Sequence, residues 1–256
     1  MDLAYRVYER RLVAGLDPGA MPRHVGVILD GNRRYARQRG MEDPNLGHLA
    51  GARKIDEFLD WCWELGVRYV TLWLLSTENL DRDATEIRGL LRIIEDTVRR
   101  IAQHPTTVER GLRVTAVGAL DLLPTETREV LKEAEEATAR HAVSFLQVAV
   151  GYGGRREIAD ALRSLLLEKA AEGATIDEVA DRLRPEDIGD HLYTTGFPEP
   201  DLIIRTSGEL RLSGFLLWQS AHSEFYFCDP NWPEFRRVDF LRALREYEGR
   251  ARRFGR

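Results

Sequence analysis

Short apolar runs alternate with longer segments of helical character along most of the chain, and this alternation restricts the fold more than any other feature. Most of the short runs are almost continuously apolar, which is typical of parallel strands covered on both faces. The alternation predicts an α/β fold: an open, mostly parallel central β-sheet of about six strands surrounded by helices. The expected strands cover residues 24–29, 69–75, 112–117, 145–150, 202–204 and, as a sixth, 225–227.

Between the strands, apolar residues recur at helical spacing and predict core-facing helices. Two such stripes separate the first three strands: Ile55, Phe58, Leu59 and Cys62, and then Ile87, Leu90, Leu91, Ile94, Val98 and Ile101. Further helices are expected from Pro124 towards His141, over residues 155–171 and over residues 239–254. We expect residues 1–256 to form a single domain.

An amphipathic helix is expected over about residues 1–16, with Leu3, Val7 and Leu12 along one side and arginines elsewhere. This segment lacks the apolar core and the cleavage site of a signal peptide. We expect the helix to pack against the body of the protein. The alternative is peripheral contact with a membrane, because basic residues beside an apolar stripe favour a lipid surface.

The composition excludes several classes of protein. The net charge is −5, so a generally basic surface for nucleic acid is not expected and any anion site must be local. Cys62 and Cys228 form no CxxC pair, so neither zinc nor a dithiol site is indicated. The longest apolar-rich run, residues 69–75, is too short to span a bilayer. A cytoplasmic, reducing compartment fits best.

The loop after the first expected strand offers an anion site, because ligands of parallel sheets bind beyond the carboxyl ends of strands. Asp30 ends the strand, Gly31 and Asn32 permit a sharp turn, and Arg33 and Arg34 begin a helix. Helix N–H groups and a guanidinium would hold a phosphate or diphosphate. A carboxylate beside that anion requires a bridging cation, for which Mg²⁺ is suited. The alternative, that Asp30 only caps the helix, stays open here.

A second group of anion-binding side chains follows the fifth expected strand. Arg205 closes the strand, and Arg211 and Ser213 come within the next eight residues. Glu224 follows in the run AHSEFYF and offers a second oxygen ligand for a metal. Exposed salt bridges are the commonest alternative for Arg and Glu. Their clustering at strand ends favours a ligand site.

Fingerprints of other phosphate-binding and hydrolytic proteins fail. Residues 151–154 read GYGG, but Arg155 and Arg156 follow and break the GxGxxG pattern, and neither GxxxxGK[ST] nor GxSxG occurs. The EDxxD of residues 186–190 stands alone behind Pro185, and a solvated helix start accounts for it.

Six longer motifs occur in one order and carry a resemblance to a known family. They read HVGVILDGNRRYAR, GHLAGARK, LLSTENLDRD, VGYGGRREI, IRTSGELRLSGFLLWQ and AHSEFYF. This set closely resembles the cis-prenyltransferases, the undecaprenyl diphosphate synthase family, over roughly residues 22–254. The resemblance implies an enzyme of isoprenoid biosynthesis, a transferase that uses Mg²⁺ to condense isopentenyl diphosphate with an allylic diphosphate and makes a new Z double bond. It also implies a homodimer.

Carried over position by position, the resemblance assigns Asp30 as the essential carboxylate near the allylic diphosphate and Mg²⁺. It makes Glu224 a second metal ligand, from its own chain or from a partner subunit, and Asn79 a catalytic residue proposed as proton acceptor. Because an amide is a very weak base, a positioning or relay role for Asn79 stays open. The implied substrate-binding residues are Gly31, Asn32, Arg33, Arg34, Tyr35, His48, Ser76, Thr77, Glu78, Leu80, Arg82, Arg205, Arg211, Leu212 and Ser213.

Leu74 is the residue from which we predict the product length. Alternation along a strand places Leu72 and Leu74 on the face of Ser76, with Leu74 about 6.6 Å deeper than Ser76. Long-chain members of the family typically carry a small residue at this position, and the LLSTENL pattern resembles actinobacterial short-chain members. Those enzymes make (2Z,6E)-farnesyl diphosphate from geranyl diphosphate. The alternatives are that Leu74 is only a core residue and that the product is a longer decaprenyl or undecaprenyl diphosphate.

Two functions of other classes stay open at this point. Some relatives have lost the catalytic carboxylate and act only as non-catalytic partner subunits, but the presence of Asp30, Arg34, Arg205 and Arg211 disfavours that role here. A nucleotide-binding α/β protein would fit the expected fold, but its fingerprints are absent.

Overall fold

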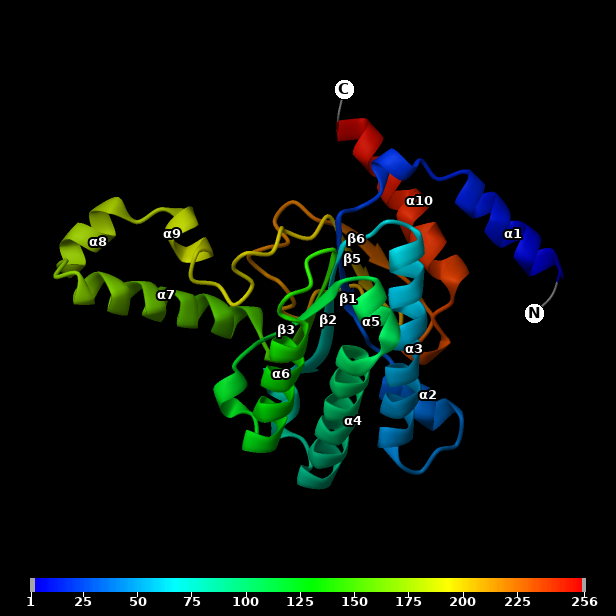
Figure 1. Cartoon of the computed structure of the whole chain (residues 1–256), viewed down its shortest axis with the longest axis horizontal. Coiled ribbons are helices and arrows are strands. Elements are labelled where there is room, and N and C mark those ends of the chain that lie inside the picture. The colour runs from blue at the N-terminus through cyan, green and yellow to red at the C-terminus, as the bar shows by residue number, and fades with distance from the viewer. Residues whose placement is uncertain (1–2, 255–256) are drawn as a thin grey trace.

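Six parallel strands form one sheet in the structure, a computed structural model that describes residues 3–254 (Figure 1). The strands lie in the order β3-β4-β2-β1-β5-β6, and every pair of neighbours runs parallel. They are β1 (His24–Ile28), β2 (Tyr69–Ser76), β3 (Leu112–Val117), β4 (Ser144–Tyr152), β5 (Leu202–Arg205) and β6 (Glu224–Phe227). The α/β prediction is confirmed, and the described sheet is parallel throughout rather than mostly parallel.

Helices follow most of the strands, as the alternation predicted. They are α1 (Leu3–Ala14), α2 (Asn32–Gln38), α3 (Pro44–Glu64), α4 (Ala84–Gln103), α5 (Pro105–Glu109), α6 (Thr125–Thr138), α7 (Gly154–Ala171), α8 (Ile176–Arg182), α9 (Pro185–Gly189) and α10 (Arg237–Phe254). Short 3₁₀ turns are η1 (Pro18–Ala20), η2 (Thr77–Asp81), η3 (Leu120–Leu122) and η4 (Trp232–Glu234). None of the described helices is both long enough and apolar enough to cross a lipid bilayer.

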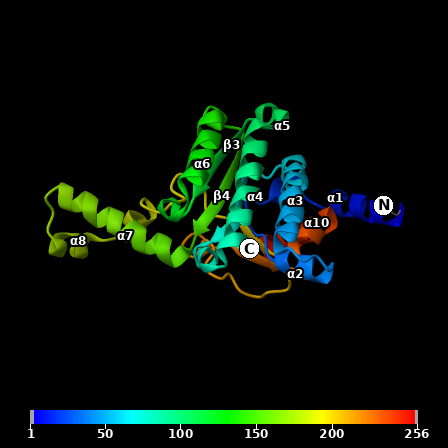
Figure 2. The same cartoon turned by 90° about the horizontal axis from the view of Figure 1, so that it is seen from below.

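The helices are distributed unevenly around the sheet. Helices α3, α4 and α6 lie side by side along one face (Figure 2). Helices α7, α8 and α9 extend away from the sheet as an arm, and α1 lies against α10 on the opposite side of the molecule (Figure 1).

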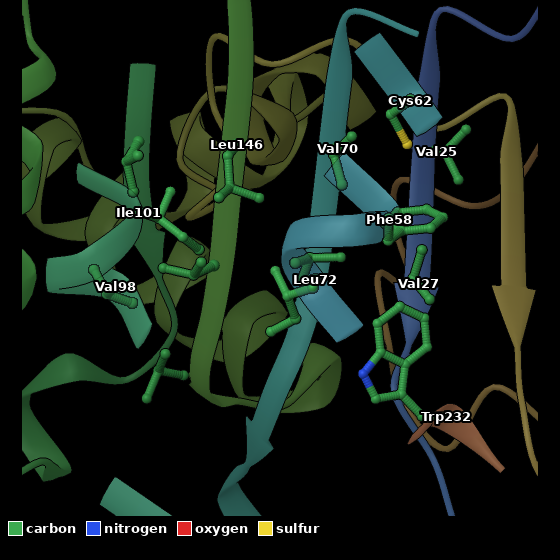
Figure 3. Packing of buried hydrophobic residues seen from close by; sticks show 14 of the residues in the cluster. Val25, Val27, Phe58, Cys62, Val70, Leu72, Val98, Ile101, Leu146 and Trp232 are labelled. Atoms are coloured by element: carbon green, nitrogen blue, oxygen red, sulfur yellow. The ribbon is translucent and has the colours of Figure 1, made fainter. Parts of the chain in front are cut away.

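The main hydrophobic core lies between the sheet and helices α3, α4, α6 and α10. Figure 3 shows Phe58 of α3, Val27 of β1 and the indole of Trp232 close to one another. The ring centroids of Phe58 and Trp232 are 5.6 Å apart, in an edge-to-face arrangement that aromatic pairs favour. Leu72 of β2 is fully buried in the same cluster. This core holds β1 and β2 in place, and with them the loops that follow the two strands.

A smaller core cluster covers the opposite face of the sheet, and part of it comes from the segment that follows β5. Phe215 stacks on Trp73 of β2 with ring centroids 5.3 Å apart and planes 13° apart. Leu216 is buried in the same cluster, against Ile203 and other strand residues. The polar loop after β5 is thus tied to the sheet by large apolar side chains directly after Ser213.

The N-terminal helix forms, but one part of the prediction for it is wrong. Leu12 is buried against Val238 and Leu241 of α10, whereas Val7 is 44% exposed and does not belong to the packed side. The side chain of Leu3 lies outside the described residues. Val7 faces solvent because α1 contacts α10 through the side that carries Leu12, and Val7 lies on another side of the helix.

The boundaries of two other helices also differ from those predicted. Helix α6 ends at Thr138, before His141, and α10 begins at Arg237, two residues earlier than expected. In the last turn of α6, the hydroxyl of Thr138 donates to the carbonyl of Ala134 at 2.9 Å. The EDxxD segment falls on α9, where Asp187 accepts a hydrogen bond from the Arg184 backbone, as expected of a solvated helix start.

Strand β1 lies in the middle of the sheet, with β2 on one side and β5 on the other. The chain builds β2, β3 and β4 on one side of β1 and then crosses to build β5 and β6 on the other. Such a reversal opens a crevice at the carboxyl ends of the central strands, where ligands of parallel sheets bind. The loops after β1, β2 and β5 all meet at this crevice.

Candidate functional site

A cavity of about 470 Å³ opens at the carboxyl ends of β1, β2 and β5. Side chains from three loops and from helices α2 and α3 line it. Thirteen of the residues predicted from the sequence lie in its wall: Asp30, Gly31, Asn32, Arg33, Arg34, His48, Leu74, Ser76, Asn79, Arg82, Arg205, Arg211 and Ser213. The structure thus brings together most of the predicted site.

Gly31 makes the turn that carries Asp30 into the cavity wall. Its φ of 100° lies in the left-handed region that glycine adopts without strain. A Cβ atom at this position would also lie 2.5 Å from the side-chain oxygen of Asn231. Asp30 accepts a hydrogen bond from the Gly31 N–H at 2.7 Å, and no side chain among the described residues caps α2. The alternative that Asp30 caps the helix is therefore wrong.

Arg205 joins the two predicted anion-binding loops. Its Nη2 donates to Oδ2 of Asp30 at 2.6 Å, and its Nη1 donates to the hydroxyl of Ser213 at 2.8 Å and to the carbonyl of Arg211. The Arg205 side chain is only 5% exposed, so it is not the exposed salt bridge that stood as the alternative, whereas Arg211 and Glu224 do form partly exposed ion pairs, with Glu209 and Arg250. Both terminal nitrogens of Arg205 are held, while its buried Nε has no partner among the described residues. The buried guanidinium gives the cavity a positive charge of fixed position.

Six arginines and one carboxylate line the cavity, which makes it strongly positive in a chain of net charge −5. Arg34 and Arg211 share the carboxylate of Glu209, and their hydrogen bonds hold the pKa of Glu209 below its usual value. Arg33 and Arg82 likewise share Glu86. Because these pairs are partly exposed to solvent, each contributes little to stability, and their guanidinium groups remain accessible to an anion in the cavity.

His48 lies on α3 at the junction of the charged and apolar parts of the site. Burial, aided by the charges of Arg82 and Arg33, lowers the pKa of His48 to about 4. The ring is therefore neutral at pH 7, and its Nε2 has no hydrogen-bond partner among the described residues. The buried Oδ1 of Asn32 is also without a described partner. Such unpaired buried polar atoms are costly unless a ligand or water satisfies them.

An apolar pocket of about 30 Å³ continues from the charged cavity between α3 and α4. Its wall consists of Leu29, Asn32, His48, Gly51, Ala52, Ile55, Leu74, Leu90, Ile93, Ile94, Thr97 and Trp232. Leu74 lines both spaces, and Ser76 lines the charged one. The strict alternation expected along β2 is interrupted, because its register against β4 shifts between Trp73 and Leu75 and again between Leu75 and Ser76. Leu74 lines the site and also packs against the main core, whereas Leu72 is enclosed in that core.

Three predicted contact residues pack into the protein instead of lining the cavity. Leu80 packs against the main core and Leu212 against the smaller cluster. Thr77 packs against Gly153, where a Cβ atom would lie 2.6 Å from the threonine hydroxyl. These side chains anchor the loops whose neighbouring residues face the cavity.

Two more predicted residues, Glu78 and Tyr35, also lie outside the described cavity wall. Glu78 is exposed at the start of η2. The ring of Tyr35 lies on α2, 5.3 Å from the guanidinium carbon of Arg39. Within this one chain, neither side chain takes part in the arrangement around Asp30 and Arg205.

Glu224 is not brought to Asp30 within one chain. It is the first residue of β6 and pairs with Leu202, whereas Arg205 pairs with Phe227 at the other end of the strand. At about 3.3 Å per residue, Glu224 lies roughly 10 Å along the strand from the level of Arg205. Its carboxylate accepts a hydrogen bond from Arg250 at 2.9 Å. The expectation that both carboxylates of one chain share a metal is therefore not met.

Several residues of the site were not predicted from the sequence. Arg37 lines the cavity from α2, and Glu86 and Glu209 each hold two of its arginines. Arg37 follows Arg33 and Arg34 by four and three residues, so helical spacing alone places all three on one face. Arg82 lies four residues before Glu86 and Arg211 two residues after Glu209, so the sequence indicates one partner of each carboxylate. The second partners, Arg33 and Arg34, come from α2, and the sequence does not indicate them.

Comparisons with known proteins agree with this arrangement. A family profile described as putative undecaprenyl diphosphate synthase matches residues 28–255. The chain is 62% identical over 251 residues to the (2Z,6E)-farnesyl diphosphate synthase of Thermobifida fusca, covering 98% of this chain and 96% of that protein. It is 51% identical over 252 residues to an isoprenyl transferase of Thermus thermophilus, covering 98% and 95%.

Two solved structures have the same fold. The lavandulyl diphosphate synthase of Lavandula x intermedia, solved with dimethylallyl diphosphate, superimposes with a TM-score of 0.81 at 33% identity, over 90% of this chain and 96% of that one. A probable undecaprenyl diphosphate synthase of Campylobacter jejuni gives a TM-score of 0.72 at 26% identity, over 92% of this chain and 99% of that one.

Gly51 offers a test of how the site is positioned. A Cβ atom on Gly51 would lie 2.2 Å from Oδ1 of Asn32 and 2.9 Å from the Trp232 indole. We predict that Gly51→Ala displaces Asn32 and lowers kcat/KM by at least about tenfold, because small displacements at a reacting centre are costly. The matched control is Gly249→Ala on α10, where nothing lies within 4 Å of an added Cβ. Steady-state kinetics that are equal for both variants would contradict the prediction.

Proposed function

The chain belongs to the undecaprenyl diphosphate synthase family and is therefore a prenyltransferase, and from this premise we propose that it condenses isopentenyl diphosphate with geranyl diphosphate to give (2Z,6E)-farnesyl diphosphate. One observation carries the proposal: Arg205 holds the loops after β1 and β5 together, so two anion-binding surfaces adjoin in one cavity that has Leu74 in its wall. The named function of the Thermobifida fusca relative supports the same product.

The two surfaces divide the substrates between them in this proposal. Arg34 and the start of α2 bind the allylic diphosphate, whereas Arg205, Arg211 and Ser213 bind isopentenyl diphosphate. Each contact is charge-assisted, and the planar guanidinium fork suits phosphate oxygens. The apolar pocket beside Leu74 faces the hydrocarbon end of the allylic substrate and must widen to receive it, because its volume is only about 30 Å³. The charged and apolar ends of one substrate thus meet matching halves of the site.

The residues present fit a magnesium ion. Asp30 reaches the cavity wall with a side chain that is 36% exposed. Among the described residues no cluster of three or more His, Cys, Asp or Glu side chains forms a complete metal cage. Mg²⁺ commonly takes only one or two carboxylates and completes its coordination with water and substrate phosphate. Asp30 would therefore hold the ion together with the allylic diphosphate, and the ion would supply charge stabilisation for the departing pyrophosphate.

The reaction replaces one bond by another without a redox step. The C1–O bond of the allylic diphosphate breaks and pyrophosphate leaves, C1 bonds to C4 of isopentenyl diphosphate, and C2 of that unit loses a proton as the Z double bond forms. The cavity arginines stabilise the negative charge that grows on the leaving group. Asn79 lies in the cavity wall, and its backbone N–H donates to Ser76 at 3.2 Å. We assign it a positioning role, because an amide is a weak base.

A homodimer is part of the proposal, because it offers Glu224 a role that one chain does not. Within its own chain Glu224 lies at the end of β6 remote from Asp30. A second subunit would supply Glu224 to the metal from outside the chain that holds Asp30. The non-catalytic partner role is disfavoured by the intact pair of Asp30 and Arg205.

The direct test is incorporation of labelled isopentenyl diphosphate with geranyl diphosphate as primer, with and without Mg²⁺. We expect a Mg²⁺-dependent C15 product in which the new double bond is Z. A wild-type enzyme that releases chains of many isoprene units would overturn the short-chain proposal. If the protein incorporates no labelled isopentenyl diphosphate under any of these conditions, the result would favour the role of a non-catalytic partner subunit.

For Asp30 we predict that Asp30→Asn lowers kcat by about 10²–10³-fold while the protein stays folded. The amide keeps an oxygen that accepts from Gly31 or Arg205 but removes the charge that holds the cation. Circular dichroism and single-turnover kinetics provide the measurement, with Asp177→Asn on the remote helix α8 as the control. A near-normal kcat in Asp30→Asn would refute the assignment of Asp30.

For Leu74 we predict that Leu74→Ala lengthens the product by at least one isoprene unit, because it removes a side chain that lines both the cavity and the apolar pocket. Leu72→Ala is the matched control on the same strand, since Leu72 lies in the closed core. Both changes are expected to cost about 2–5 kcal/mol of stability or less. Product chromatography decides: an unaltered product from Leu74→Ala, or equal lengthening by both variants, would exclude Leu74 as the stop.

A further inference from the structure

Arg37 lines the cavity, but the proposed reaction gives it no contact of its own. It lies in the last turn of α2, and its side chain forms part of the cavity wall. Its spacing of four residues from Arg33 and three from Arg34 puts the three arginines on one face of the helix. Because a helical side chain leans back over the preceding turn, the guanidinium of Arg37 is directed towards the turn that carries the other two.

Arg37 also differs from the other cavity arginines in having no side-chain partner among the residues that the structure describes. The other five are held by the carboxylates of Asp30, Glu86 and Glu209. Across residues 3–254, the Arg37 side chain makes no ion pair, no hydrogen bond and no contact with an aromatic ring. It is exposed to solvent. Arg37 therefore presents a full positive charge at the cavity.

This difference decides which arginine attracts an incoming anion most strongly. A guanidinium that shares a carboxylate presents a partly neutralised charge, whereas no carboxylate among the described residues neutralises Arg37. The cavity wall as a whole is positive, since its six arginines face only three carboxylates in the described part of the chain. A concave wall of one sign concentrates the field and draws in ions of the opposite sign. Arg37 is therefore suited to meet a diphosphate before the held arginines do.

We propose that Arg37 is a capture residue for the allylic diphosphate: it makes the first contact with the incoming anion and guides it to Arg34 and the turn after β1. The inference rests on the proposed function, because it uses the assignment of the allylic diphosphate to Arg34 and the start of α2. A charge at the rim of a site acts mainly on the association rate. Arg37 thus binds substrate without taking part in the bond changes.

Two other roles of an exposed arginine at this position make different predictions. A cation in the last turn of a helix is stabilised by the helix dipole, which concerns the stability of α2 and not the rate of binding. Any exposed arginine also adds to the net charge, an effect that its position does not change. Capture by Arg37 instead predicts an effect that is confined to the allylic diphosphate, requires a positive charge at this position and weakens as salt screens that charge.

The experiment measures the association of geranyl diphosphate without isopentenyl diphosphate, so that no condensation occurs. Trp73 in the cavity wall and Trp232 in the wall of the apolar pocket provide a fluorescence signal for stopped-flow mixing. We expect Arg37→Gln to lower the association rate constant about five- to tenfold at low ionic strength. At about 0.5 M salt we expect the difference from the wild type to fall below about twofold. Arg37→Lys keeps the charge and is expected to keep most of the rate.

Arg53→Gln is the matched control. Arg53 is likewise exposed and has no side-chain partner among the described residues, but it lies on α3 outside the walls of the cavity and of the apolar pocket. Both substitutions remove one positive charge, so an effect of net charge alone would be the same in both variants. We expect Arg53→Gln to keep the association rate of the wild type.

Steady-state kinetics show which substrate the charge of Arg37 serves. We expect Arg37→Gln to raise the KM for geranyl diphosphate about five- to tenfold at low ionic strength. The kcat and the KM for isopentenyl diphosphate are expected to stay within about twofold of the wild type, because the charge acts before the bond changes and on the other substrate.

An unchanged association rate in Arg37→Gln, or an equal loss in Arg53→Gln, would overturn the inference. A loss that salt does not reduce, or that Arg37→Lys shows in full, would also overturn it, as would an equal rise in the KM for isopentenyl diphosphate. A wild type that binds geranyl diphosphate but does not condense it would refute the proposed function, whereas the association rates would still test Arg37. A wild type that does not bind geranyl diphosphate would refute both.

Discussion

The ion pair between Asp30 and Arg205 is the contact on which the arrangement of the site depends. The two residues are 175 positions apart in the chain, and each ends or follows a central strand of the sheet. Arg205 is almost fully buried, whereas Asp30 is 36% exposed towards the cavity, so the carboxylate balances a buried charge while it stays within reach of a ligand. Because the same guanidinium also holds Ser213 and the carbonyl of Arg211, one buried charge fixes both loops relative to each other.

The remaining features of the cavity follow from that fixed charge. The exposed arginines around it are held by only two carboxylates, Glu86 and Glu209, so their positive field is available to an incoming anion. Burial keeps His48 neutral at the point where the charged wall meets the apolar pocket. The site therefore changes within a short distance from a surface suited to diphosphate to one suited to hydrocarbon, which is the division an isoprenyl substrate itself has.

Much of the fold was predictable because buried parallel strands leave nearly continuous apolar runs, and the polar loops after them marked the cavity. Side-chain positions that depend on contacts between distant elements could not be predicted from the sequence. Glu209 pairs with Arg211 of its own loop and also with Arg34 of α2, which is 175 positions away and which no pattern in the sequence places beside it. The position of Glu224 could have been predicted from the sequence. It comes at the amino end of its parallel strand, whereas Asp30 follows the carboxyl end of β1, and these ends lie at opposite edges of the sheet. The prediction for Val7 was wrong because a short helix can turn either of its sides towards a neighbouring helix.

The central claim is that Asp30 balances Arg205 in the free protein and holds a cation when diphosphate binds. Calorimetric titration with inorganic pyrophosphate tests it without turnover, in wild type and in Asp30→Asn, each with and without Mg²⁺. The account predicts that Mg²⁺ strengthens pyrophosphate binding to the wild type by at least about tenfold, and that this enhancement is lost in Asp30→Asn. An equal enhancement by Mg²⁺ in both proteins would contradict the account.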